Sequence, residues 1–180
     1  FPDAEWSIWL DNKSRLLMPP AQIIDTLQAH SSAAFHAFPH FRRDCVYQEG
    51  QAVWENGLAD HVLVKQRLET YRAEALPERA GLIEGHFIVR RHHDPEVIRF
   101  GDRWMEHVLR YSRRDQLSFP YLAHKLSLRY DLITCLDRAL TVQLTVFDRK
   151  TREPEFKRRN VTYQQLRAIW HRLKRMGSVS

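Results

Sequence analysis

The sequence has few of the residues that mark the commonest kinds of functional site. Its only two cysteines, Cys45 and Cys135, are too few and too far apart for a metal knuckle or a disulfide framework. Its six glycines are scattered, so neither a Walker-type nor a dinucleotide-type phosphate loop is present. The Gly-x-Ser-x-Gly nucleophile elbow is missing as well. Two thiols are compatible with a reducing cytosol.

Long apolar runs are also missing, because no stretch approaches the roughly 18 residues needed to cross a bilayer. The chain shows no internal repeat, no low-complexity tract, no signal peptide and no initiating Met. We therefore expect a protein without a transmembrane segment that is cytoplasmic, or peripheral to the inner face of the membrane. We also expect the chain to be a segment of a longer protein.

What is present is a globular composition with a positive charge. At 180 residues and 43% hydrophobic, the chain can bury one core. Its net charge of +6 favours anionic partners such as nucleotide phosphates, nucleic acid or acidic lipids. Because no groove-reading or base-stacking motif accompanies the charge, no specific nucleic-acid partner is expected.

Hydrophobic periodicity predicts alternating strands and helices, and hence an α/β layered fold. Strands are predicted at 6–10, 82–91, 132–136 and 141–147. Helices are predicted at 21–30, at 53–72 with Trp54, Leu58, Val62, Leu68 and Tyr71 inward, from Pro95 to Tyr111 after an Asp94 cap, and at 117–128. Residues 36–49 are predicted to form a loop.

The C-terminal end is predicted to be separate from this layered region. Residues 150–159 form a charged linker, and Thr162-x-x-Gln165 is a capping box that begins a helix with a basic outer face. The sequence thus predicts one domain at 1–149 and an appended linker and basic helix at 150–180.

Polar side chains gather in four places along the chain. Asp11 follows a predicted strand, where a carboxylate can hold Mg²⁺ or Mn²⁺ or simply make a turn. The run from His40 to Glu49 contains Arg43, a candidate phosphate clamp, beside groups that equally suit a solvated loop and helix cap. The other two places are 84–93 and 111–119.

The strand at 82–91 carries charge at both ends. His92, His93 and Asp94 suggest a metal site, but adjacent residues on a strand point to opposite faces. Arg90 or His92 is therefore expected to be a single inward polar group. The segment 111–119 places Arg114, Asp115, Gln116 and Ser118 beside aromatic residues, at a helix end or at a site.

The order of these motifs resembles one family, the glycosyltransferase-like domain of bacterial polysaccharide-associated and plant turgor- and mucilage-related proteins. The resemblance runs from about residue 6 to residue 125. It is carried by Trp9-Leu10-Asp11, His40-x-x-Arg43-Asp44-Cys45-x-Tyr47-x-Glu49, Gln66, Tyr71, Gly81-Leu82-x-Glu84, Val89-Arg90-x-His92 and Arg114-Asp115-Gln116-Leu117-Ser118-Phe119.

The resemblance implies a nucleotide-diphospho-sugar transferase fold of the GT-A type, with its N-terminal nucleotide-binding part truncated here. It implies that Asp11 holds Mn²⁺ or Mg²⁺, although Asp11-Asn12-Lys13 stands where Asp-x-Asp is usual. His92 is a second candidate metal ligand. Asp115 is then the candidate catalytic residue, assisted by Arg114 and Gln116. The candidate substrate-binding residues are His40, Arg43, Tyr47, Glu84, Arg90 and Ser118.

Three functions follow as hypotheses. The first is transfer of a sugar from a nucleotide-sugar donor to a saccharide acceptor in polysaccharide biosynthesis. The second is a metal-dependent, ceramidase-like hydrolysis of a lipid amide, with His40, His92 and Glu49 as zinc ligands. The third is a non-catalytic basic module that binds an anionic polymer through its last helix.

Overall fold

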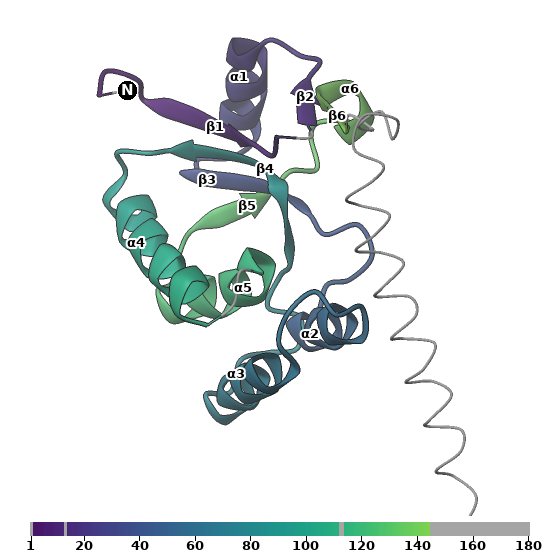
Figure 1. The fold of residues 1–180 in the computed structure, drawn as a ribbon. Coiled ribbons are helices and arrows are strands. Elements are labelled where there is room, and N and C mark those ends of the chain that lie inside the picture. The colour runs from purple at the N-terminus through teal and green to yellow at the C-terminus, as the bar shows by residue number, and fades with distance from the viewer. Residues whose placement is uncertain (1, 13, 112–113, 145–180) are drawn as a thin grey trace, which may run out of the picture. The chain divides into compact units, whose positions relative to one another are not determined.

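The computed structural model describes residues 2–12, 14–111 and 114–144 (Figure 1). A mixed four-stranded sheet has the order β1-β4-β3-β5 and is formed by Trp6–Leu10, Ile83–Arg91, Phe35–Pro39 and Tyr130–Leu132. Strand β4 is antiparallel to both β1 and β3, and β5 is parallel to β3. A separate antiparallel pair joins β2 (Ser14–Leu16) to β6 (Val142–Leu144).

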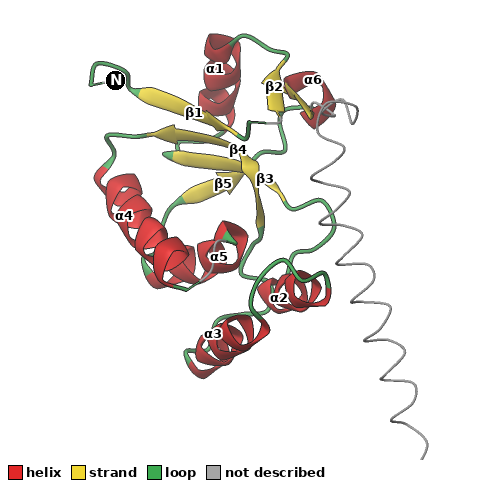
Figure 2. Cartoon of the chain, viewed as in Figure 1, coloured by secondary structure: helices red, strands yellow, loops and turns green. Residues whose placement is uncertain are grey.

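Helices cover both faces of the larger sheet, as Figure 2 shows. Helix α1 (Pro20–His30) lies on one face, and α4 (Pro95–Arg110) and α5 (Asp115–Lys125) lie on the other. The remaining helices are α2 (Val46–Glu55), α3 (His61–Ala73) and the short α6 (Arg138–Thr141). The expectation of a mixed α/β fold is thus confirmed.

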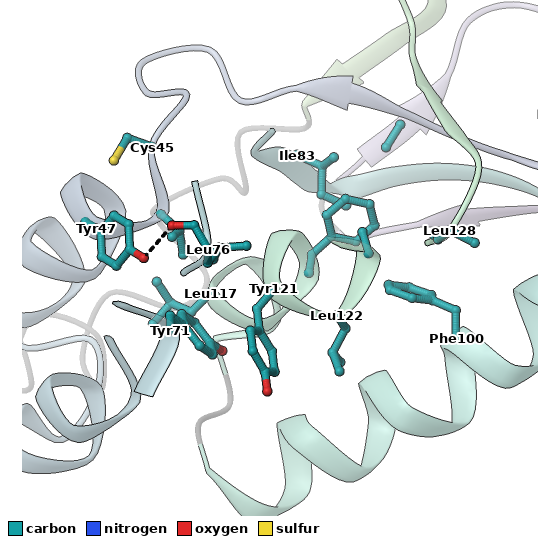
Figure 3. Close-up of a cluster of buried hydrophobic side chains, with 14 of the residues drawn as sticks. Cys45, Tyr47, Tyr71, Leu76, Ile83, Phe100, Leu117, Tyr121, Leu122 and Leu128 are labelled. Carbon is teal, nitrogen blue, oxygen red and sulfur yellow. Dashed lines mark hydrogen bonds between the residues drawn. The ribbon is translucent and has the colours of Figure 1, made fainter. Parts of the chain in front are cut away.

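Strand β4 divides the core between the two faces. Phe87 and Val89 pack with α1, whereas Ile88 packs with α4 and α5, as the predicted alternation of this strand requires. Each large apolar side chain buried in this way contributes about 1.5–3 kcal/mol. In the larger cluster Tyr71 stacks on Tyr121 with 4.3 Å between ring centroids (Figure 3).

Helix α4 begins where the sequence predicts. The Asp94 carboxylate accepts hydrogen bonds from the backbone N–H groups of Glu96 and Val97, and Pro95 occupies the first turn. The predicted strands at 6–10 and 82–91 and the helix at 21–30 are also confirmed within one residue.

Two predicted elements are wrong. Residues 36–49 are not a loop, because 35–39 form the buried strand β3 and α2 begins at Val46. A strand buried on both faces lacks the polar alternation that marks a strand in sequence. The helix predicted at 53–72 is two helices, because Gly57 adopts a φ of 64° and Asp60 caps α3. Trp54, Leu58 and Val62, predicted to point inward, are exposed.

Three predictions near the C-terminal end need comment. The strand predicted at 132–136 is at 130–132 instead, and α6 precedes β6 at 142–144. The helix predicted at 117–128 is α5 at 115–125. The linker at 150–159, the basic final helix and the boundary at 149 fall outside the described residues and stay predictions. No helix in the described ranges is long and apolar enough to span a membrane.

Candidate functional site

The sheet topology brings separate parts of the sequence to one edge. Because β1 and β3 run in the same direction, their C-terminal ends meet where β4 begins. The Asp11 N–H donates to the His86 carbonyl at 2.9 Å, and the His40 N–H donates to the Leu82 carbonyl at 2.8 Å. A cavity of about 370 Å³ opens at this edge, and it is lined by Asp11, His40, Phe41, Arg43, Glu49, Ala52, Val53, Asn56, Leu58, Glu84, Gly85, His86, Arg114, Asp115 and Gln116.

One side of the cavity is a loop organised by His40. Its Nδ1 accepts hydrogen bonds from the backbone N–H groups of Arg42 and Arg43, at 3.3 and 3.1 Å. The proton of the neutral ring therefore belongs on Nε2, which lies 3.6 Å from a buried Glu49 oxygen. Burial lowers the pKa of His40, so the ring is neutral at pH 7. Arg43 Nε donates to the same Glu49 oxygen.

A second group centres on Glu84. Its carboxylate accepts from the Phe41 N–H at 3.2 Å and contacts His86 Nδ1 and Arg138 Nη1, each at 2.9 Å. Burial opposes ionisation of this group, but His86 and Arg138 outweigh it and lower the pKa of Glu84 below its ordinary value. Arg138 also donates to the Pro39 carbonyl at 2.7 Å, so α6 is tied to the end of β3.

Asp115 lies at the opposite wall, in the first turn of α5. Its Oδ1 accepts from the Gln116 N–H at 2.9 Å, and Gln116 Nε2 donates to the Ile83 carbonyl at 3.2 Å. Burial raises the pKa of the Asp115 carboxyl above its ordinary value, and the nearby charge of Asp11 adds to this. Gly85 leaves room for the carboxylate, because a Cβ there would stand 2.6 Å from Asp115 Oδ2.

The structure gathers seven of the predicted site residues around this cavity, namely Asp11, His40, Arg43, Glu84, Arg114, Asp115 and Gln116. Three others lie elsewhere. Tyr47 is buried, and its hydroxyl donates to the Leu76 carbonyl at 2.9 Å. Ser118 is buried and donates to the Asp115 carbonyl. Arg90 donates to Ser7 Oγ on the open part of the sheet face.

His92 is also remote from the cavity, because it follows the far end of β4. Nine residues of strand span roughly 30 Å, so His92 and His40 lie at opposite ends of the sheet. The zinc set His40, His92 and Glu49 is therefore wrong. Among the described residues no group of three His, Cys, Asp or Glu side chains is placed to hold a metal ion.

The carboxylates of the cavity bear on whether Mn²⁺ or Mg²⁺ fits. Glu49 is engaged by Arg43, and Glu84 by Arg138. Asp11 lies close enough to Asp115 for its charge to act on the Asp115 pKa. Hard divalent cations are commonly bound by one or two carboxylates, with substrate phosphates and waters completing the shell. The carboxylates of Asp11 and Asp115 thus suit a cation that is bound together with a phosphorylated substrate.

Three residues of the site were missed by sequence reasoning. Phe41 is 64% exposed at the cavity, and His86 and Arg138 flank Glu84. An exposed Phe inside a polar run is a usable signal for Phe41. His86 lies within the segment 84–93, which carries charge at both ends. Nothing in the sequence near Arg138 indicates its contact with Glu84.

Comparison with known proteins identifies the family of the chain. The family model described as TOD1/MUCI70, glycosyltransferase-like domain, matches residues 1–154. Over 135 residues the chain is 30% identical to a protein from Arabidopsis thaliana named "Probable hexosyltransferase MUCI70". The aligned part is 71% of this chain and 23% of that relative, so the chain spans about a quarter of the relative's length. No solved structure matches the chain. The chain belongs to the TOD1/MUCI70 glycosyltransferase-like domain family.

Proposed function

We propose that this domain transfers a sugar from a nucleotide-sugar donor to a saccharide acceptor in polysaccharide biosynthesis, on a GT-A-like fold. The observation that supports it most is the cavity at the ends of β1 and β3. Two arginines and four carboxylates from distant parts of the sequence line that cavity. Family membership and a relative named as a hexosyltransferase support the same reaction class.

The diphosphate of the donor is assigned to the two arginines that line the cavity, Arg43 and Arg114. Glu49 occupies Nε of Arg43, and this contact fixes the direction of the guanidinium plane. The two Nη groups carry the remaining donors, in a geometry that suits phosphate oxygens. Fixed positive charge at this position stabilises the negative charge that develops on the leaving diphosphate.

Asp11 would hold Mn²⁺ or Mg²⁺ on the same diphosphate, with phosphate oxygens completing the shell. The bound cation would supply further neutralisation of the leaving group. In the chain itself, Asp11 is fixed by two backbone contacts, since its N–H donates to His86 and its carbonyl accepts from the Ser14 N–H at 2.8 Å. These contacts position the Asp11 backbone at the end of β1.

Asp115 is assigned the role of base towards the acceptor hydroxyl. The acceptor oxygen forms a bond to the anomeric carbon of the donor while the bond from that carbon to the diphosphate breaks. The electron pair of the broken bond leaves on the diphosphate, and the hydroxyl proton passes to the Asp115 carboxylate. A carboxyl with a raised pKa accepts this proton more readily. Gln116 fixes the start of α5 through Ile83.

The proposal is tested by calorimetric titration of the protein at its natural length with a panel of sugar nucleotides, with and without Mn²⁺. We expect one nucleotide sugar to bind, more tightly with the cation, and Arg43→Gln to weaken that binding at least about tenfold. Lys65→Gln, which removes an exposed charge on α3, serves as the matched control. Absence of binding by every sugar nucleotide would contradict the proposal.

A further inference from the structure

A second cavity adjoins the first and has different chemistry. It has a volume of about 420 Å³ and lies between the open part of the sheet face and helix α4. We call it the Trp9 groove, and it is lined by Trp9, Ile88, Arg90, Gly101, Trp104, Met105, Val108 and Asp115. Asp115 lines both this groove and the polar cavity at the strand ends.

The groove exists because α4 leaves the edge strand uncovered. Trp9 pairs with Ile88 across β1 and β4, and both side chains face α4. The helix contributes residues at positions 101, 104, 105 and 108, which share one face at helical spacing. At Gly101 an added Cβ would meet nothing within 4 Å, so the missing side chain widens the groove.

The walls combine exposed aromatic surface with a few polar groups. Trp9 is 54% exposed and Met105 is 59% exposed, although both belong to regular elements of the fold. Trp104 is held in place, because its indole N–H donates to the Asp115 carbonyl at 3.0 Å. Arg90 donates through Nε to Ser7 Oγ at 3.2 Å, which ties its side chain to the neighbouring strand β1.

We infer that the Trp9 groove binds the acceptor saccharide, an inference that rests on the proposed transferase function. The C–H face of a pyranose ring packs on an indole plane, and its hydroxyls take hydrogen bonds from an arginine. A sugar ring packed on Trp9 would place the rest of the saccharide beside Asp115, which lines both the groove and the donor cavity.

The inference is tested with oligosaccharides of four to six residues, in neutral and uronic-acid forms, titrated into the protein at its natural length. Binding is followed by saturation-transfer NMR and by Trp fluorescence. We expect at least one oligosaccharide to bind, Trp9→Ala to weaken it about tenfold or more, and Gly101→Leu to abolish it by filling the groove. Leu109→Ala, which shortens a 79% exposed side chain of α4 that does not line the groove, should leave binding unchanged.

The same variants separate this inference from the proposed function. If Trp9→Ala and Gly101→Leu keep donor binding but lose the oligosaccharide, both proposals are supported. If the wild type binds the donor while oligosaccharide binding is absent or insensitive to both substitutions, the groove inference is overturned and the transferase proposal stands. If no sugar nucleotide binds but groove-dependent oligosaccharide binding remains, the transferase proposal fails instead. A dimer that dissociates on Trp9→Ala would assign the groove to a second copy and also overturn the inference.

Discussion

The proposed role of Asp115 requires a charged carboxylate, whereas burial of this side chain favours the neutral carboxyl group. Burial raises its pKa, so the charged form needed to accept a proton is disfavoured in the folded protein. A raised carboxyl pKa means that the folded state binds the proton more tightly than the unfolded state does. Above the ordinary aspartate value of 3.8, stability therefore declines as pH rises through the folded pKa. In the proposed mechanism, this loss of stability accompanies a base placed where the two cavities meet.

Replacing Asp115 with Asn is expected to affect stability and sugar transfer differently. The amide oxygen can still accept from the Gln116 N–H, and the buried charge is gone, so thermal stability at pH 7 should stay level or rise. Transfer should fall by about 10²–10⁴-fold, the usual loss on removing a general base. The wild-type rate should also rise with pH along a limb displaced above pH 3.8, and Asn should abolish that limb. Equal transfer by both proteins would remove Asp115 from the mechanism.

Gly85 is predicted to control the position of the same carboxylate. In Gly85→Ala the new Cβ would stand 2.6 Å from Asp115 Oδ2, so the carboxylate must move. A displacement on the order of 1 Å at a reacting group can cost about 10²-fold in rate. We expect kcat to fall by roughly that factor while the melting temperature changes little. Leu109→Ala, at an exposed position of α4 that lines neither cavity, is the control. Unchanged kcat in Gly85→Ala would refute the close approach.

At the scale of single residues, the sequence could predict part of this site. Asp11 and Asp115 were identifiable because they stand at element ends, where backbone direction places polar groups at a sheet edge. Tyr47 and Arg90 belong to the same motifs but lie in the core and on the sheet face. Motif order alone does not say which residues of a motif face the cavity.

Whether a strand or helix could be predicted from the sequence depended on whether one of its sides is solvated. Strand β1 and helix α4 have one solvated side, so their periodicity is visible in the sequence. Strand β3 has four consecutive buried residues, including His36, and shows no alternation. The break between α2 and α3 depends on Gly57 and on the Asp60 cap. The sequence does not predict this break, because apolar residues continue at helical spacing across it.

The contact between α2 and α3 depends on a missing side chain at Gly50. A Cβ there would stand 2.5 Å from Leu68 Cδ1, so Gly50→Ala should overpack the contact and cost about 1–3 kcal/mol. Leu68→Ala alone should cost about 2–5 kcal/mol by opening a cavity. The double variant should lose less than the sum, since the new methyl group occupies part of that space. Denaturant unfolding of the four proteins measures the coupling.

One result of this double-mutant cycle would contradict the expected contact between Gly50 and Leu68. Strict additivity of the Gly50→Ala and Leu68→Ala losses would mean that the two residues do not touch. Gly101→Ala, a helical glycine in open space, should instead stabilise the protein by about 0.5–1 kcal/mol. Because Gly50 neighbours Glu49 in α2, the same overpacking should also disturb Arg43 and weaken donor binding.

For the molecule as a whole, histidines set the expected response to mild acid. Burial lowers the pKa of His36, His40 and His107 from 6.5 in the folded state. The unfolded chain therefore binds more protons below pH 6.5 than the folded chain does, and stability must fall as pH falls. Each proton taken up on unfolding contributes a slope of about 1.4 kcal/mol per pH unit. Asp115 acts in the opposite direction, from pH 3.8 upward.

Urea unfolding between pH 5 and pH 7.5 tests this expectation, with the free energy of unfolding as the measured quantity. The charged group that acts on His36 is Asp131, and those that act on His40 are Glu49, Arg43, Glu84 and Arg138. Those that act on His107 are Arg67, Glu106, Lys125 and Arg103. We expect the free energy to decrease below pH 6.5 with a slope between one and three protons. His107→Gln should reduce that slope by up to one proton relative to His124→Gln, which replaces an exposed histidine on α5. A free energy that stays flat or rises towards pH 5 would mean that these rings are not held neutral by burial.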